Sequence, residues 1–271
     1  MYNNKGRRTM FDLKTKLAGA LFAAAAMIAG PAAADLQEIL AAGKVRIGVP
    51  VDVPPFGFVG KSNEPVGLDV DVANMIGKAL GVEVELQQIT GANRIPYLVT
   101  DRLDMVISAM GATPERAQLV AFSSPYSALA IGVFGPDSIA VGAPGDLGDQ
   151  TIAVARGTTQ DLELTAAAPD AKITRFDDDA TAAAAFLSGQ ADLLATANVV
   201  ARDLMQKNDG VELNAKFILR YAPTHVGVQQ GNPEILRWLD TFVFYHMLTG
   251  ELSDLTEKWL GQPLPENFPS L

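Results

Sequence analysis

The feature of this chain that most constrains its fold is a repeated alternation of short β-rich runs with amphipathic runs of helical spacing. In Asp69–Leu80 the apolar residues recur at intervals of three and four, and Gly81 follows the last of them, which is typical of a helix and its end. We expect strands at 45–49, 82–88, 105–107, 121–122, 151–155, 172–176 and 193–195, an extended run at 218–229, and helices at 36–42, 69–80, 94–100, 160–168, 179–188, 198–207, 233–248 and 251–260. Strand–helix–strand alternation predicts a mainly parallel sheet with helices on both faces.

The alternation stops at a Gly- and Pro-rich connection and then begins again, so the sequence predicts two α/β lobes. We expect the chain to pass between the lobes twice, near 126–134 and near 221–228. The segments assigned to the lobes are 35–128 and 222–271 for lobe one, and 129–221 for lobe two. Helix N-termini and strand C-termini would face each other across the cleft between the lobes, which makes this cleft the candidate ligand site.

The N-terminal segment has the composition of a secretory signal peptide. Five basic residues precede an apolar run at 17–30, and small residues at 32–34 match an A-x-A cleavage site. The apolar run is shorter than the ~20 residues that a membrane-spanning helix needs. We therefore expect residues 1–34 to form a cleavable signal peptide and the rest of the chain to be exported to the periplasm.

The composition excludes several classes of function. The 31 acidic and 21 basic residues give a formal net charge of −10, which argues against nucleic acid as a partner. The absence of cysteine excludes disulfides, cysteine-ligated metals and thiol nucleophiles. With His225 and His246 as the only histidines, no metal site is expected, and no cofactor is expected either.

Nine short stretches occur in a fixed order and spacing, and the set is far more specific than any one of its members. They are Asp52–Phe58, Gly67–Ala73, Asn93–Leu98, Asp104–Ile107, Thr113–Arg116, Phe122–Tyr126, Gly157–Thr159, Gly189–Asp192 and Trp259–Gly261. Over residues 35–262 the set resembles the family 3 periplasmic solute-binding proteins, the receptors of polar amino-acid ABC importers. The resemblance implies a two-lobe "Venus flytrap" fold and a small-molecule ligand, an amino acid or related carboxylate, between the lobes. It also implies an ABC transporter permease in the inner membrane as partner.

Arg116 is the strongest candidate ligand residue. The resemblance implies that the arginine of the Thr113–Arg116 segment binds the α-carboxylate of the ligand. A guanidinium group binds a carboxylate through two parallel hydrogen bonds, and a nearby helix N-terminus adds partial positive charge. The alternative is a surface arginine that pairs with Glu115 or another acidic neighbour.

Thr158 and Thr159 follow Gly157 between an expected strand and an expected helix, where free N–H groups and a hydroxyl can meet an anion. The resemblance implies that lobe two contributes to carboxylate binding here, chiefly through Thr159. Plain N-capping by a threonine is the alternative, and it is compatible with ligand contact.

Ala109 and Gly111 align with positions at which the family holds the ligand's ammonium and carboxylate. At Ala109 the implied contact uses the backbone carbonyl, so it survives any side chain. At Gly111 the usual threonine hydroxyl is absent.

The sequence departs from the family pattern at three positions. Ala197 stands where the resemblance implies a lobe-two aspartate that pairs with the α-ammonium, and Val53 and Gly91 stand where aromatic walls are usual. Two alternatives stay open. Either the ligand is not an ordinary α-amino acid but a small carboxylate, an N-substituted amino acid or a larger molecule, or Asp52 or Asn198 restores the missing polarity.

Other charged residues have two possible roles each. Arg94 either meets an acidic ligand group or forms a surface salt bridge. Asp69 and Asp71 lie at the start of an expected helix, where N-capping and helix-dipole stabilisation are the favoured roles. His225 is expected to pack at the second crossing rather than to bind ligand.

The function expected from these observations is the periplasmic solute-binding component of an ABC importer, and not an enzyme. A periplasmic enzyme on the same scaffold, similar to cyclohexadienyl dehydratase, is one alternative, but it needs a general acid in the cleft and only Asp52 is evident. A receptor that presents its closed state to a sensor kinase is the other alternative.

Overall fold

A computed structural model describes residues 36–264 together with Met1 and Phe268. The predicted signal peptide otherwise lies outside the described residues and stays a prediction. The fold belongs to the unit that comprises residues 33–271. Among the residues described, no helix combines the length and the apolar character that crossing a membrane requires.

One eight-stranded sheet runs through both lobes in the order β5-β1-β6-β11-β7-β10-β8-β9. Its strands are β1 (Lys44–Val49), β5 (Glu83–Gln88), β6 (Met105–Val106), β7 (Val120–Gly135), β8 (Thr151–Ala155), β9 (Lys172–Phe176), β10 (Leu193–Ala197) and β11 (Asn214–Gln229). The pairs β1–β5 and β1–β6 in lobe one, and β8–β10 and β8–β9 in lobe two, are parallel. The predicted two-lobe α/β fold with mainly parallel sheets is thereby confirmed.

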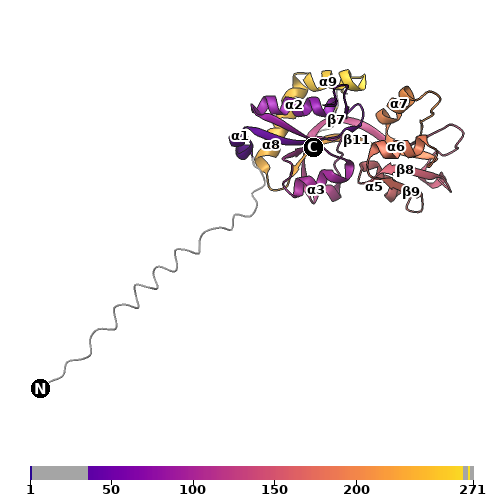
Figure 1. The fold of residues 1–271 in the computed structure, drawn as a ribbon, viewed down its shortest axis with the longest axis horizontal. Helices are drawn as coiled ribbons and strands as arrows, with labels where there is room; N and C mark the ends of the chain where they lie inside the picture. Colours follow the sequence, from indigo (N-terminus) through magenta and orange to yellow (C-terminus); the bar gives the residue numbers. More distant parts are fainter. Residues whose placement is uncertain (2–35, 265–267, 269–271) are drawn as a thin grey trace. The chain divides into compact units, whose positions relative to one another are not determined.

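The two parallel halves are joined by β7 and β11, which are 16 residues long and pair antiparallel along their length. Both strands run from one lobe into the other (Figure 1). They include the two regions expected to carry the chain across. Within β7 the sequence predicted only a short strand at 121–122, whereas within β11 it predicted an extended run at 218–229. The boundaries between the lobes stay a prediction.

Helices cover both faces of the sheet in each lobe (Figure 1). Lobe one carries α1 (Leu36–Ala42), α2 (Leu68–Leu80), α3 (Arg94–Val99), α4 (Pro114–Ala117), α8 (Pro233–Leu248) and α9 (Glu251–Leu260), and lobe two carries α5 (Thr159–Ala167), α6 (Asp179–Leu187) and α7 (Asn198–Lys207). Short 3-10 turns occur at η1 (Gly91–Asn93) and η2 (Pro144–Asp146). A small sheet of β2 (Asp52–Val53), β3 (Gly57–Val59) and β4 (Pro65–Val66), which the sequence did not predict, lies in lobe one.

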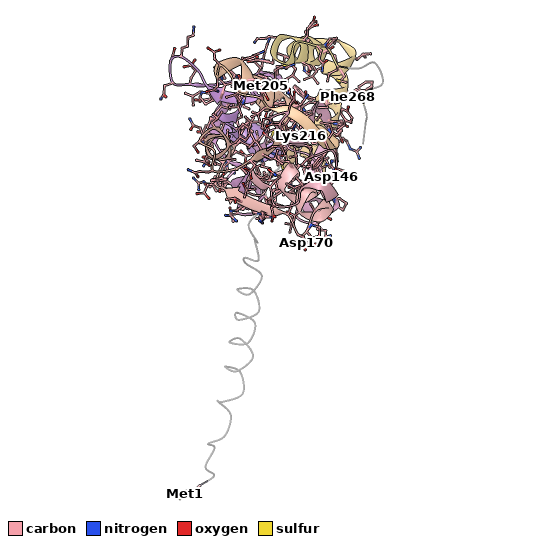
Figure 2. All side chains as sticks on the ribbon, turned by 90° about the vertical axis from the view of Figure 1, so that its right-hand side faces the viewer. Met1, Asp146, Asp170, Met205, Lys216 and Phe268 are labelled. Atoms are coloured by element: carbon pink, nitrogen blue, oxygen red, sulfur yellow. The ribbon has the colours of Figure 1, made fainter. Side chains whose placement is uncertain are left out.

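Each lobe has its own apolar packing against the shared sheet. In lobe one, Ile47 of β1 and Ile76 of α2 are fully buried in the same cluster. In lobe two, Val154 of β8 and Leu164 of α5 are fully buried together. Full burial of such a side chain stabilises the fold by about 1.5–3 kcal/mol. Acidic side chains such as Asp146 and Asp170 lie at the surface of lobe two (Figure 2).

Candidate ligand-binding site

A small cavity of about 20 Å³ lies between the lobes. Residues of both lobes line it: Val53, Arg94, Ala109, Leu129, Ile131, Thr158, Thr159, Gln160, Asp179, Ala197 and Ala222. A volume of this size has room for roughly one water molecule. The lobes must therefore separate before a molecule the size of an amino acid can enter.

Arg116 connects the lobes beside this cavity. It lies in α4, whose N-terminus is capped by Thr113, and its side chain is buried. One terminal nitrogen, Nη1, donates to the Gly111 carbonyl at 2.6 Å and to Thr159 Oγ1 at 2.9 Å. The other, Nη2, donates to the Gly157 carbonyl at 2.9 Å. Arg116 is thus not a surface arginine paired with Glu115; we call it, with Thr159, the basic pole of the site.

The charge of Arg116 is affected by its surroundings. Burial lowers the pKa of its guanidinium to about 10, and the positive charges of Arg94 and Arg220 act in the same direction. The group is still protonated at neutral pH. Several positive charges near one another in a buried site favour the binding of an anion.

Thr158 and Thr159 divide the two roles that the sequence left open. Thr158 is the N-cap of α5, because its hydroxyl accepts from the Asp161 N–H at 3.3 Å and donates to the Ala155 carbonyl at 2.8 Å. The Thr159 hydroxyl faces Arg116 instead. The residue that caps α5 and the residue whose hydroxyl meets Arg116 are therefore neighbours.

Ala109 is held by a residue for which the sequence predicted a different role. Its backbone has a positive φ of 44°, and its N–H donates to Asp69 Oδ2 at 2.8 Å. The other carboxylate oxygen of Asp69 accepts from the Tyr126 hydroxyl at 2.6 Å. The capping part of the prediction for Asp69 is wrong, because Gly67 occupies the N-cap position of α2 and makes no side-chain cap, although Asp69 does lie in the first turn of this helix.

Asp69 is fully buried, and burial raises the pKa of its carboxyl group to about 7. Its two hydrogen bonds fix the loop that presents Ala109 to the cavity. Asp71, the other predicted capping residue, accepts hydrogen bonds from Lys258 and Trp259 and so ties α2 to α9.

Asp52 and Asn198, the two residues predicted to restore polarity, lie in different surroundings. The Asn198 side chain is exposed, and its Oδ1 accepts from the Ala130 N–H at 3.1 Å. It is not among the residues that line the cavity. Asp52 Oδ2 accepts from the backbone N–H of Asp179 at 2.8 Å, and this hydrogen bond joins lobe one to the start of α6.

Asp179 is a cavity residue that the sequence analysis missed. It is 6% exposed, and its Oδ1 lies 3.4 Å from the Gln160 amide nitrogen. Burial, reinforced by the nearby negative charge of Asp52, raises the pKa of Asp179 to about 7, and burial raises that of Asp52 as well. The available signal was the run Asp177-Asp178-Asp179 between a strand and a helix. We call Asp52 and Asp179 the acidic pole.

Arg94 lines the cavity rather than forming a surface salt bridge. It is 4% exposed, and its Nε donates to the buried Ser108 hydroxyl at 3.1 Å. Within the described part of the chain, it makes no ion pair with a carboxylate. Its charge lowers the pKa of Asp52, Asp69 and Asp179.

The two glycines that differ from the family pattern lie at close contacts between the lobes. A β-carbon at Gly91 would lie 2.9 Å from Thr158 Cγ2, so lobe two occupies the space that a missing aromatic was expected to leave open. A β-carbon at Gly111 would lie 3.0 Å from Thr159 Oγ1. Val53, in contrast, does line the cavity.

His225 is buried away from the cavity, with Nδ1 2.8 Å from the Ser123 carbonyl and its ring against Phe122. Burial lowers the pKa of its imidazole. The histidine is therefore a packed residue of β11.

Comparison with known proteins shows which family and which solved structures this chain resembles. The chain matches the family model "Bacterial extracellular solute-binding proteins, family 3" over residues 45–262. The L-cystine-binding protein TcyJ of Escherichia coli (strain K12) is 27% identical to it over 229 residues, which cover 83% of this chain and 86% of TcyJ.

Two solved structures extend the comparison. The solute receptor for L-cysteine of Neisseria gonorrhoeae matches with a TM-score of 0.79 and 31% identity, covering 83% of this chain and 93% of that one. The ancestral amino acid-binding protein AncCDT-1, a precursor of cyclohexadienyl dehydratase, matches with a TM-score of 0.76 and 32% identity, covering 83% and 98%.

Proposed function

We propose that this chain, which belongs to the bacterial extracellular solute-binding proteins of family 3, binds an amino acid or a related carboxylate through its basic pole. It acts as the periplasmic solute-binding component of an ABC importer and delivers the solute to a permease in the inner membrane. Export through the predicted signal peptide is part of the proposal. The related TcyJ and the gonococcal receptor, named for cystine and cysteine, support the class of ligand.

The observation that carries the proposal is the convergence of lobe-one and lobe-two groups on Arg116. The guanidinium is buried, and its hydrogen bonds reach the hydroxyl of Thr159 and the carbonyl of Gly157 across the boundary between the lobes. A ligand carboxylate that takes the place of these partners would contact Arg116 and the N-terminus of α5 at once. Such an anion at a helix N-terminus is electrostatically favoured.

Ligand binding of this kind drives closure of the lobes. A solute that contacts both lobes binds the closed state more tightly than the open state, and the difference in affinity sets how far the equilibrium shifts. The long strands β7 and β11, which pass between the lobes, are the elements that must bend. A permease and a sensor kinase would each recognise the closed state.

An enzyme on the same scaffold is less well supported. The relatives carry the names of binding proteins, and AncCDT-1 is itself described as an amino acid-binding precursor of a dehydratase. An enzyme of this kind would need a general acid in the cleft, and among the described residues Asp179 is the buried carboxyl group that lines the cavity. Incubation of the protein with prephenate or arogenate tests this alternative directly, and product formation would favour it.

A thermal-shift screen tests the proposed function. The chain from Asp35 onward is mixed with the twenty amino acids, L-cystine, small carboxylates, N-methylated amino acids and osmolytes. A ligand at 100 times its dissociation constant stabilises the folded protein by ~2.7 kcal/mol, which raises the melting temperature by several degrees.

Two variants identify the site. We expect Arg116→Ala to abolish the shift and Arg237→Ala, which removes an exposed arginine of α8, to preserve it. An absence of any shift with carboxylates, or an unchanged shift in Arg116→Ala, would overturn the proposal.

A further inference from the structure

The charges around the cavity leave one position open for a cation. Arg94 carries one positive charge, and Asp52 and Asp179 can carry two negative charges. When both aspartates are ionised, the three groups carry a net charge of −1, which either one proton or one cationic group of a ligand can neutralise. The Arg94 terminal nitrogens donate to no side chain among the described residues, so this arginine does not neutralise either aspartate by direct contact.

Asp179 is the member of the group that is directed at the ligand space. It is nine-tenths buried and lines the cavity, together with Thr159 of the basic pole. Asp52 is occupied by the backbone N–H of Asp179, whereas Asp179 receives only a long hydrogen bond from Gln160. A buried carboxylate without a strong partner is costly, and a ligand ammonium can supply that partner.

Ala197 gives the reason why this carboxylate is needed. It lines the same cavity from the end of β10, and its methyl group offers no charge to an ammonium. Asp179 lines the cavity from the start of α6, a different element of lobe two. Asn198 cannot substitute, since its side chain is exposed and bonded to Ala130.

We propose that the acidic pole binds the protonated amino group of the ligand, so that the ligand is a zwitterion held by its carboxylate at Arg116 and by its ammonium at Asp179. This inference rests on the proposed function, because it requires a carboxylate at the basic pole. It assigns to Asp179 and Asp52 the task for which Ala197 lacks the chemistry. The substrate class is then that of free α-amino acids rather than amine-free carboxylates.

Binding of the ammonium is coupled to release of a proton. The pKa of Asp179 is raised to about 7, first by burial and then by Asp52, while Arg94 lowers it and Asp178 adds to the increase. In the neutral range the folded protein therefore keeps this carboxyl group partly protonated. When the ligand binds, its amine stays protonated, the Asp179 carboxyl loses its proton to solvent, and a carboxylate–ammonium pair forms. Asp69 also lies within reach of the Arg94 charge, but both of its oxygens already accept hydrogen bonds.

Matched pairs of ligands provide the first test. Isothermal titration calorimetry at pH 7 measures the twenty amino acids and L-cystine. Each one that binds is compared with its analogue that carries hydrogen in place of the α-amino group, such as succinate for L-aspartate, glutarate for L-glutamate and glutaramate for L-glutamine. We expect each amino acid that binds to bind at least about 10-fold more tightly than its amine-free analogue, because a charge-assisted hydrogen bond is lost.

A variant locates the effect. Asp179→Asn is expected to weaken binding of the tightest amino acid by about 10- to 100-fold and to leave its amine-free analogue within about threefold of the wild type. Asp177→Asn, which removes the same charge at an exposed position two residues away, is expected to change neither. Arg116→Ala weakens both members of a pair.

Proton release gives a readout that needs no variant. Titrations at pH 7 in phosphate and in Tris, which differ in ionisation enthalpy, are expected to show net release of protons when an amino acid binds. Release should disappear in Asp179→Asn.

The outcomes separate the two levels of the proposal. If amino acids bind and Arg116→Ala abolishes binding, but the amine-free analogues bind equally well and Asp179→Asn has no effect, the role of the acidic pole is overturned and the proposed function stands. Binding of amino acids that is weakened by Asp179→Asn without proton release would overturn the coupling. If no carboxylate binds at all, both proposals fail.

Discussion

The basic pole and the acidic pole both join the lobes, but they do so with opposite chemistry. At the basic pole a guanidinium donates from a side chain of lobe one to a hydroxyl and a carbonyl of lobe two. At the acidic pole a carboxylate of lobe one accepts from a backbone N–H of lobe two. A molecule with a negative and a positive end can be held between such poles in one orientation, because reversing it places like charges together.

The two poles also differ in how they respond to pH. Arg116, with a pKa of about 10, keeps its charge throughout the neutral range. Asp179, with a pKa of about 7, changes its charge within that range. On the proposed roles of the two poles, we expect carboxylate binding to be constant near neutrality and ammonium binding to strengthen as the pH rises through 7.

The largest expected effect concerns stability and pH. The carboxyl groups of Asp69 and Asp179 have pKa values of about 7 when folded and near 3.8 when unfolded. The stability that each contributes is therefore complete below pH ~4 and is lost as the pH rises to ~7. For Asp69 alone the loss amounts to about 4 kcal/mol.

Urea unfolding at pH 4, 5.5 and 7 measures this effect. We expect the free energy of unfolding to fall over this range in the wild type and to fall less in Asp69→Asn and in Asp179→Asn. The exposed Asp170→Asn serves as the control and should follow the wild type. Identical slopes in the wild type and in both buried variants would contradict the assignment of raised pKa values.

The second expected effect distinguishes the two poles by the kind of ligand whose affinity falls. Thr159→Val removes the hydroxyl that meets Arg116 and keeps nearly the same volume. Affinity should fall about 10-fold, because Thr159 can then no longer donate a hydrogen bond to the ligand carboxylate, and hydrogen bonds to charged groups contribute about 1.5–3 kcal/mol. The loss should be equal for an amino acid and its amine-free analogue, unlike the loss in Asp179→Asn.

Calorimetry on matched ligand pairs checks this prediction. Thr241→Val, in which the altered hydroxyl is exposed on α8, is the control. If Thr159→Val weakened amine-bearing ligands alone, the separation into two poles would be incorrect.

The third expected effect tests the close approach of the lobes. A β-carbon at Gly91 would lie 2.9 Å from Thr158 Cγ2 and 3.1 Å from the Arg156 carbonyl. Gly91→Ala should therefore hinder closure of the lobes and weaken the binding of every ligand by about fivefold. This factor corresponds to about 1 kcal/mol, the lower end of the 1–3 kcal/mol typical of overpacking. Gly145→Ala is the control, because nothing lies within 4 Å of its β-carbon. Small-angle scattering with saturating ligand checks whether the variant stays more open, and an unchanged radius of gyration and affinity would argue against the contact.

The residues of the basic pole could be predicted from the sequence, whereas for the acidic pole the sequence offered Asp52 as a candidate and missed Asp179. Arg116 and Thr159 lie in short motifs whose order and spacing are informative, and each motif also fixes its local structure: Thr113 caps α4 and Thr158 caps α5. Asp52 and Asp179 are separated by 127 residues, and only the packing of β2 against α6 brings them together. No local pattern reports such a contact.

The same physical reason explains the other differences. Asp69 was predicted to cap a helix because acidic residues favour the first turn, but its actual partners, Ala109 and Tyr126, are distant in sequence. The elements with helical or alternating periodicity were predicted at nearly the observed positions. Of the long strand β7 only 121–122 was predicted as a strand, since β7 is buried along most of its length and shows no alternation.

The smallest expected effect concerns how α6 presents the acidic pole. Asp178 caps this helix through a reciprocal pair of hydrogen bonds with Thr181. Asp178→Ala should lower the free energy of unfolding by about 1 kcal/mol, the usual cost of a lost N-cap. It should also weaken the binding of amino acids, by less than about threefold, because the N–H of Asp179, which anchors Asp52, belongs to the same helical turn.

The matched change at the basic pole is Thr158→Ala, which removes the cap of α5. The affinities of both variants are measured for amino acids and for their amine-free analogues. If Asp178→Ala weakens the binding of amino acids alone, and Thr158→Ala weakens the binding of both kinds of ligand equally, the two poles are independent. Equal losses in both variants would instead mean that the caps act through closure as a whole.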